Sequence, residues 1–255
     1  MTIEISLRPR PKRRGWRFWF TPHPKVIAVF AFRYDAHLVP GLLQNIEPFI
    51  DGWVSYDDRA NTAPPTTEPQ RRHALIEAAH AAGANWILAV DPDERFEDRL
   101  KDRMVELTAK RGRFAWSFNF REMYSPTEYR VDGLWGRKRQ RRLFPIFDGL
   151  FPIAERHSFS TKPFHGEWAP NGYKIRHSHV NLYHLKMIAP ARREARRDLY
   201  NALDPDREFQ KIGYDYLADE TGARFERMAP QRAYSPPHID DGGLWMADPA
   251  KIVKP

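Results

Sequence analysis

The sequence predicts an α/β fold with a mostly parallel central sheet, flanking helices and a C-terminal helical segment. Strand-like and helix-like segments alternate over residues 25–121, the order that builds a parallel sheet covered by helices. The chain has 255 residues, of which 42% are hydrophobic, so it can bury the core of one large domain. We expect a basic arm over residues 1–24, a single domain over 25–220 and a tail over 221–255.

The predicted domain begins with a continuous apolar run, KVIAVFAFR at residues 25–33, which is typical of a buried parallel strand. Apolar residues at near-helical spacing then predict a helix within residues 38–51. GWVSYDD indicates a second strand, which ends on Asp57 and Asp58. The polar, proline-rich residues 59–69 can continue neither element, so we expect a loop long enough to suggest a function.

The alternation continues with strong helix formers, a third apolar run, an amphipathic segment and an alternating segment. The expected elements are a helix at 70–83, a strand at 85–90, a helix at 95–112 and a strand at 113–121. Residues 123–183 are rich in aromatic, proline, glycine and basic residues, so we expect irregular segments with short strands there. Helix returns over residues 188–217, and the residues beyond Gly222 are largely irregular.

Carboxylates gather at the predicted strand ends, where ligands bind in parallel α/β sheets. The third strand runs directly into Asp91, Pro92, Asp93 and Glu94, and crowded carboxylates resist burial unless a cation neutralises them. An Asp-x-Asp turn offers oxygen ligands to Mg²⁺ or Mn²⁺, whose shell substrate phosphates often complete. The sequence therefore indicates a metal and diphosphate site.

A structural alternative explains the same acidic turn. Pro92 suits the second position of a turn, and acidic residues favour the positive N-terminus of a following helix. The tripeptide recurs as Asp204-Pro205-Asp206, but there it follows a predicted helix instead of a buried strand. We interpret this second copy as a loop and cap.

The formal charge of +8 is concentrated at the N-terminus, where residues 1–25 hold seven basic residues against Glu4 and so carry +6. Aromatic residues lie between these basic residues, and an arm of this kind can bind an anionic membrane surface or nucleic acid. The structural alternative is a solvated terminus without a partner. The absence of cysteine excludes disulfides, thiolate metal ligands and a cysteine nucleophile. No apolar run approaches the ~20 residues of a membrane span, and none forms a secretory signal. We expect a cytoplasmic protein that contacts a membrane only peripherally, through its arm.

The order VIAVFAFR, helix, WVSYDD, loop, QRRHALIEAAHAAGANWILAVDPDERFE resembles the N-terminal half of a bacterial family 2 glycosyltransferase with the GT-A fold. The resemblance covers residues 25–120, and RRLFP and LYHLKMIAPARREARRDLY resemble downstream segments. It implies a metal-dependent, inverting hexosyltransferase that moves a sugar from a nucleotide-sugar, with UDP as the first choice. The acceptor would be a cell-surface glycan or glycolipid bound by residues 121–220.

The resemblance also implies roles for the strand-end residues. Asp57 or Asp58 would contact the base or ribose, Asp91 the ribose or a metal-bound water, and Asp93 the metal. In some enzymes of this fold a distant histidine completes the metal shell, which makes His184 the third ligand of Mn²⁺ or Mg²⁺ here. The family's Asp-Ser/Gly-Ser-x-Asp after the second strand is replaced by DDRANTAPPT, which leaves the nucleotide base open.

Two further sets of residues complete the predicted chemistry. An inverting transfer needs a carboxylate to accept the acceptor's proton. Family members place it in a His-Glu element after RLF, and FHGEW offers Glu167, with Glu122 and Asp132 as alternatives. Positive charge near the leaving phosphate would lower the barrier, and the candidates for it are Arg71, Arg72 and Arg142.

A nucleic-acid-binding protein, or a metal-dependent nuclease, is the rival reading. It is motivated by the basic arm, the run RKRQRR and the paired carboxylates. Charge outside residues 1–25 is nearly balanced, whereas a nucleic-acid-binding face concentrates positive charge. We therefore expect a nucleotide-sugar and a glycan or glycolipid as the partners. His177 and His179 could supply two ligands to a separate zinc site, but the sequence has no third ligand at a recognised spacing.

Overall fold

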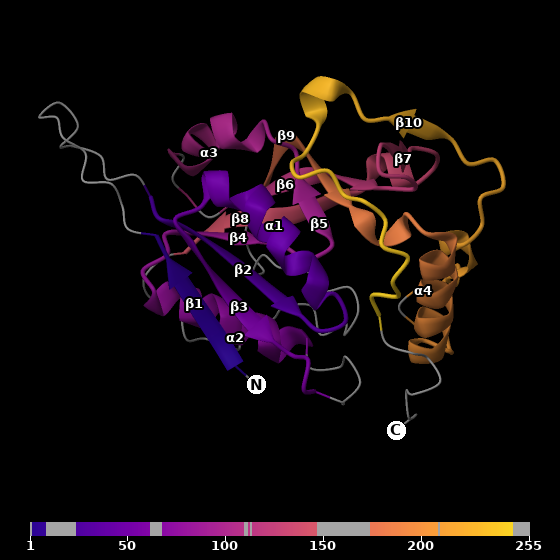
Figure 1. Cartoon of the computed structure of the whole chain (residues 1–255), viewed down its shortest axis with the longest axis horizontal. Helices are drawn as coiled ribbons and strands as arrows, with labels where there is room; N and C mark the ends of the chain where they lie inside the picture. Colours follow the sequence, from indigo (N-terminus) through magenta and orange to yellow (C-terminus); the bar gives the residue numbers. More distant parts are fainter. Residues whose placement is uncertain are drawn as a thin grey trace, which may run out of the picture.

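The computed structural model describes residues 2–8, 24–61, 68–109, 112, 114–146, 174–208 and 210–246 (Figure 1). An eight-stranded sheet with the order β1-β3-β2-β4-β8-β6-β9-β5 forms its centre, and a two-stranded sheet, β7-β10, lies apart. The strands are β1 (Thr2–Leu7), β2 (Val26–Phe32), β3 (Gly52–Asp57), β4 (Trp86–Ala89), β5 (Glu94–Phe96), β6 (Phe114–Glu122), β7 (Glu128–Arg130), β8 (Arg139–Pro145), β9 (Lys174–His184) and β10 (Phe225–Arg227).

The described α-helices are α1 (Val39–Ile46), α2 (Glu68–Ala81), α3 (Leu100–Ala109) and α4 (Pro190–Leu203). Short 3₁₀ turns are η2 (Ala36–Leu38), η3 (Glu47–Phe49), η5 (Trp135–Arg137), η6 (Leu185–Met187), η7 (Asp215–Leu217) and η8 (Pro230–Arg232). Figure 1 shows α1 and α3 on one side of the sheet and α2 on the other.

The prediction of a mostly parallel, Rossmann-like sheet was wrong, because the described sheet is mixed, mostly antiparallel and curled into a half-barrel. Strand β2 pairs in parallel with β3 and β4, and β6 pairs in parallel with β9. The antiparallel pairs are β1 with β3, β4 with β8, β6 with β8 and β5 with β9. The chain turns back after β6, so β8 inserts between β4 and β6 and runs against both of them.

Strand β2 explains why the parallel part forms where it does. Val26, Ala28 and Phe30 are buried in the core under α1 and α3, whereas Ile27 and Val29 are buried under α2. A strand that is buried on both faces needs a continuous apolar sequence, and this is the run found at residues 26–32.

Two segments of the chain differ from the expected elements. Residues 2–7 of the predicted arm form β1, an antiparallel edge strand on β3, and the rest of the arm, residues 9–23, lies outside the described residues. The helix expected at 95–112 begins only at Leu100, because residues 94–96 form β5 against β9. The acidic turn therefore leads into a strand and not directly into a helix.

The C-terminal segment, residues 228–246, runs back across the domain, and its trace passes from the upper edge of Figure 1 toward α4. The Ser235 backbone N–H donates to Asp98, two residues before α3, and Asn45 of α1 donates to the Ser235 carbonyl, at 2.8 and 2.9 Å. Arg192 of α4 pairs with Asp240 at 2.6 Å. The segment thus connects α3, α1 and α4.

Candidate functional site

The acidic ends of β3 and β4 do lie on the same side of the sheet, at the carboxyl ends of its parallel strands. Strands β3 and β4 flank β2 and run parallel to it, so their carboxyl ends meet there. The backbone N–H of Asp58 donates to the carbonyl of Phe32, the last residue of β2, at 3.0 Å. Asp91 and Asp93 are the second and fourth residues after β4. The sequence prediction that these carboxylates fall at strand ends is confirmed.

At the end of β3, each carboxylate is paired with an arginine nearby in sequence. Arg59 Nη2 lies 2.7 Å from Asp57 Oδ2, and this hydrogen-bonded guanidinium holds the pKa of Asp57 below its usual range. Arg71 of α2 donates to the buried Asp58 carboxylate at 3.0 Å. Arg72, the next residue of α2, is itself buried.

At the end of β4, Arg142 of β8 enters the acidic turn. Its Nη2 lies 3.0 Å from Asp91 Oδ2, and its guanidinium also binds the buried Glu94 carboxylate through Nε at 3.1 Å and through Nη2. Burial raises the pKa of Glu94 to about 7; Arg142 opposes that rise and Asp91 adds to it. Arg142 was predicted near the phosphate, and here it neutralises the two carboxylates that flank the turn.

Asp93 points into a second group of charges, and it is 1% exposed. Lys186 Nζ lies 3.0 Å from Asp93 Oδ2, and His184 Nε2 lies 3.4 Å from the same oxygen. The other nitrogen of His184, Nδ1, is 2.5 Å from Oε2 of Glu122, which is fully buried. Lys138 Nζ in turn lies 3.0 Å from Glu122 Oε1. We call these five residues, Asp93, His184, Lys186, Glu122 and Lys138, the buried charge cluster.

Mutual pairing keeps the buried charge cluster ionised. Burial alone would lower the pKa of His184, but Glu122 and Asp93 outweigh it and raise that pKa to about 9. Burial would raise the pKa of Asp93, but Lys186 and His184 hold it well below its usual range. Lys138 and His184 likewise hold the pKa of Glu122 far below that of a free glutamate. His184 is thus an imidazolium at neutral pH, with both ring nitrogens facing carboxylates.

Asp35, three residues after β2, completes this edge and was not identified from the sequence. It is half-buried, and burial together with the negative charge of Asp93 raises its pKa to about 6, while Lys186 acts against the rise. The sequence signals for the missed residues are weak: an aspartate shortly after a buried strand, and a lysine two positions after His184 in HLKM.

The described contacts do not fit a divalent cation held by Asp91, Asp93 and His184. Within the described ranges, no three acidic or histidine side chains converge closely enough to hold a metal ion. Asp93 already contacts Lys186 and His184, and Asp91 contacts Arg142.

The three candidates for the catalytic base differ in their surroundings. Glu167 lies outside the described residues. Glu122 is enclosed by Lys138 and His184, so it cannot meet an acceptor hydroxyl. Asp132 binds Arg130 through both carboxylate oxygens, at 2.9 and 3.0 Å, and these bonds lower its pKa to about 2. A carboxylate so easily ionised is a weak base, which leaves Glu167 as our prediction.

Several other predicted features have structural roles. Asp204 ends α4, and its carboxylate accepts from Tyr214 at 2.7 Å, so the second Asp-Pro-Asp is a loop and cap as predicted. The rings of His177 and His179 lie 4.4 Å apart, without a third metal ligand in the described part of the chain.

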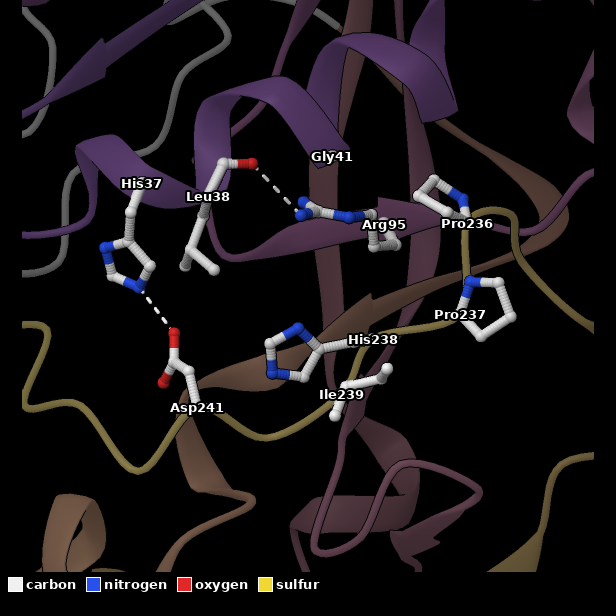
Figure 2. Close-up of a pocket in the computed structure, with 9 residues that line it drawn as sticks. All are labelled: His37, Leu38, Gly41, Arg95, Pro236, Pro237, His238, Ile239 and Asp241. Carbon is white, nitrogen blue, oxygen red and sulfur yellow. Dashed lines mark hydrogen bonds and ion pairs between the residues drawn. The ribbon is translucent and has the colours of Figure 1, made fainter.

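A separate pocket lies on the other side of β5, between η2, α1 and the C-terminal segment (Figure 2). Arg95 reaches into it and donates to the carbonyls of Pro92, Glu94 and Leu38 at 2.8, 2.7 and 3.2 Å. At its far side His37 contacts Asp241 at 2.6 Å. Arg95 therefore supports the backbone of the acidic turn from behind.

Comparisons with known proteins add no assignment. No protein-family model matches the chain, and no curated protein matches it at a significant level. In the described residues, no helix is both long enough and apolar enough to cross a membrane.

Proposed function

We propose that this protein transfers a sugar from a nucleotide-sugar, with UDP as the first candidate nucleotide, to a glycan or glycolipid acceptor. The observation that supports this best is the grouping of acidic and basic side chains at the joint carboxyl ends of β2, β3 and β4. Such an edge is where parallel strands present ligand-binding residues.

The resemblance to family 2 glycosyltransferases supports the same proposal. It rests on residues 25–120, and this stretch contains the three parallel strands and the acidic ends that the resemblance uses. In this proposal Asp57 and Asp58 lie nearest the base or ribose, on the opposite side of β2 from the acidic turn that follows β4. Arg71, Arg72 and Arg142 supply positive charge around the nucleotide.

The reaction is a single displacement. The acceptor's hydroxyl oxygen forms a bond to the anomeric carbon, and the bond from that carbon to the β-phosphate oxygen breaks, with its electron pair passing to the phosphate. The acceptor's proton goes to a carboxylate, for which Glu167 is our candidate. Preorganised positive charge lowers the barrier because negative charge grows on the leaving diphosphate.

Two residues of the basic run at 137–142, Lys138 and Arg142, do not support a nucleic-acid-binding function. Lys138 and Arg142 are directed inward, onto Glu122 and onto Asp91 with Glu94. They are therefore not part of a surface that could neutralise phosphates along a nucleic acid.

A thermal-shift panel tests the proposal. The ligands are UDP, GDP, CMP, dTDP and a short DNA duplex, tested on the wild type, on Asp93→Asn and on Asp206→Asn. Asp206 is the control because it is exposed and occupies the same position in the second Asp-Pro-Asp. A nucleotide at a hundredfold excess over its Kd should stabilise the fold by about 2.7 kcal/mol.

We expect one nucleoside diphosphate to raise the Tm of the wild type and of Asp206→Asn, and to have a much smaller effect on Asp93→Asn. A shift with DNA, and with none of the nucleotides, would contradict the proposal and favour the nucleic-acid alternative.

A further inference from the structure

Lys186 occupies the place where a transferase of the predicted kind would hold its metal. Its Nζ lies 3.0 Å from Oδ2 of Asp93, the residue predicted to bind the metal directly. The backbone fixes this arrangement, because the N–H of Leu185 donates to the carbonyl of Asp93 at 2.8 Å. Lys186 is thus anchored by its neighbour in sequence and is not a surface side chain that has folded inward.

The surroundings of Asp93 leave little room for a second cation. Oδ2 of Asp93 is buried without a well-oriented hydrogen bond, and its neighbours are the charged groups of Lys186 and His184. A divalent cation on this oxygen would have to displace Lys186 or remain within a few ångströms of it. Two cations that close repel each other strongly in a poorly solvated site.

Lys186 nevertheless remains accessible from one side. Its side chain is 22% exposed, whereas that of Asp93 is 2% exposed. The side chain of Lys186 is therefore less enclosed than that of its carboxylate partner. A lysine ammonium carries three donors and binds phosphate as a point charge.

Basic side chains outnumber carboxylates in this part of the site. Glu122 contacts His184, Lys138 and Arg196 at 2.5, 3.0 and 3.8 Å, and Asp93 contacts Lys186 and His184. Asp35 is the third carboxylate that acts on this group, through Lys186. Four basic side chains thus face three carboxylates, and such a surplus of cations is the kind of field that a diphosphate needs.

We propose that Lys186, held on Asp93, supplies the positive charge for the leaving diphosphate, so that a nucleoside diphosphate binds here without a divalent cation. This inference rests on the proposed transferase function and changes its expected cofactor. During the displacement described above, the electron pair released to the β-phosphate oxygen is stabilised by the Lys186 ammonium, and no proton needs to leave the lysine.

The test measures the affinity of UDP, GDP and inorganic pyrophosphate by titration calorimetry, in EDTA and in Mn²⁺. The proteins are the full-length wild type, Lys186→Met, Lys186→Arg and Lys101→Met. Lys101 is the control because it is exposed on α3, away from the acidic edge. Thermal unfolding of each variant without ligand is recorded beside the titrations.

We expect wild-type affinity for one nucleoside diphosphate to agree within about threefold between EDTA and Mn²⁺. Lys186→Met should weaken binding at least about tenfold, since each such factor is 1.4 kcal/mol of lost charge interaction. Lys186→Arg and Lys101→Met should stay near the wild type.

If the wild type binds the nucleotide at least tenfold more tightly in Mn²⁺ than in EDTA, the inference is overturned and the transferase proposal is left intact. This comparison needs no variant, so it decides the question even if Lys186→Met unfolds. Unchanged affinity in a folded Lys186→Met would also overturn it. Failure of every nucleotide and of pyrophosphate in both buffers would contradict the transferase proposal itself.

Discussion

The acidic ends of β3 and β4 lie on either side of β2 in one sheet, and they are neutralised in different ways. Asp57 and Asp58 pair with Arg59 and Arg71, two and thirteen residues further along the chain. The carboxylates after β4 pair with residues at least 48 positions away, on β8, β9 and η6.

Burial follows the same division. The side chain of Arg59 is 61% exposed, whereas Arg142, Glu94 and Asp93 are buried. An exposed ion pair contributes little to stability because water screens it, but removing one partner of a buried pair leaves an uncompensated charge. The β4 end should therefore respond strongly to single substitutions and the β3 end weakly.

The largest effect is expected for Arg142→Met, which leaves both Asp91 and Glu94 without their cation. We expect a loss of about 4 kcal/mol in the free energy of unfolding at pH 8.5, measured by urea titration. The loss should be smaller at pH 5.5, because Glu94, with a pKa near 7, can then take up a proton.

Arg139→Met is the matched control, since Arg139 lies on the same strand but is exposed. It should change the unfolding free energy by less than about 0.5 kcal/mol. Equal losses for the two variants would show that β8 contributes to the unfolding free energy through its strand pairing and not through the buried charge of Arg142.

A second prediction concerns pH and His184. Its pKa is raised from 6.5 to about 9, so its contribution to stability is fully present below pH 6.5 and is lost as pH rises through 9. Relative to His184→Gln, the wild type should lose up to about 3 kcal/mol of unfolding free energy between pH 6 and pH 10. Parallel pH profiles for the two proteins would contradict the assignment of an imidazolium.

Arg71→Met should have a moderate effect. Asp58 is buried and accepts a charged hydrogen bond from Arg71, so we expect a loss of about 2 kcal/mol in urea titrations. Lys in place of Arg71 should recover part of it. A loss as large as that of Arg142→Met would remove the distinction between the two strand ends.

Arg59→Met should have the smallest effect on stability in the series. The pair with Asp57 is local and largely solvated. We expect no measurable change in the midpoint of urea unfolding. A clear loss would mean that the end of β3 depends on this exposed pair more than its solvent access suggests.

The same contrast explains which parts of the fold follow from the sequence. Strand β2 carries its signal in its own residues, since a continuous apolar run needs burial on both faces. The position of β8 depends on pairing across long stretches of chain, and no local pattern in RQRRLFP specifies that it inserts between β4 and β6. Strand β5 was missed because Phe96 and Leu100 have helical spacing.

The site follows the same rule. Asp57, Asp58, Asp91 and Asp93 could be located because each ends a strand that is visible in the sequence. The pairing of Asp93 with Lys186 could not be predicted, because only the closed sheet brings these two residues together. His184 was reached through the family resemblance alone, and its contact with Glu122 had no local signal.

The most direct measurement is a crystal structure of the protein with the nucleoside diphosphate selected by the thermal-shift panel. We predict the diphosphate at the carboxyl ends of β2 and β4, with a phosphate oxygen about 2.8 Å from Lys186 Nζ and the base near the end of β3. A nucleotide bound elsewhere, for example in the pocket between η2, α1 and the C-terminal segment, would contradict the proposed site.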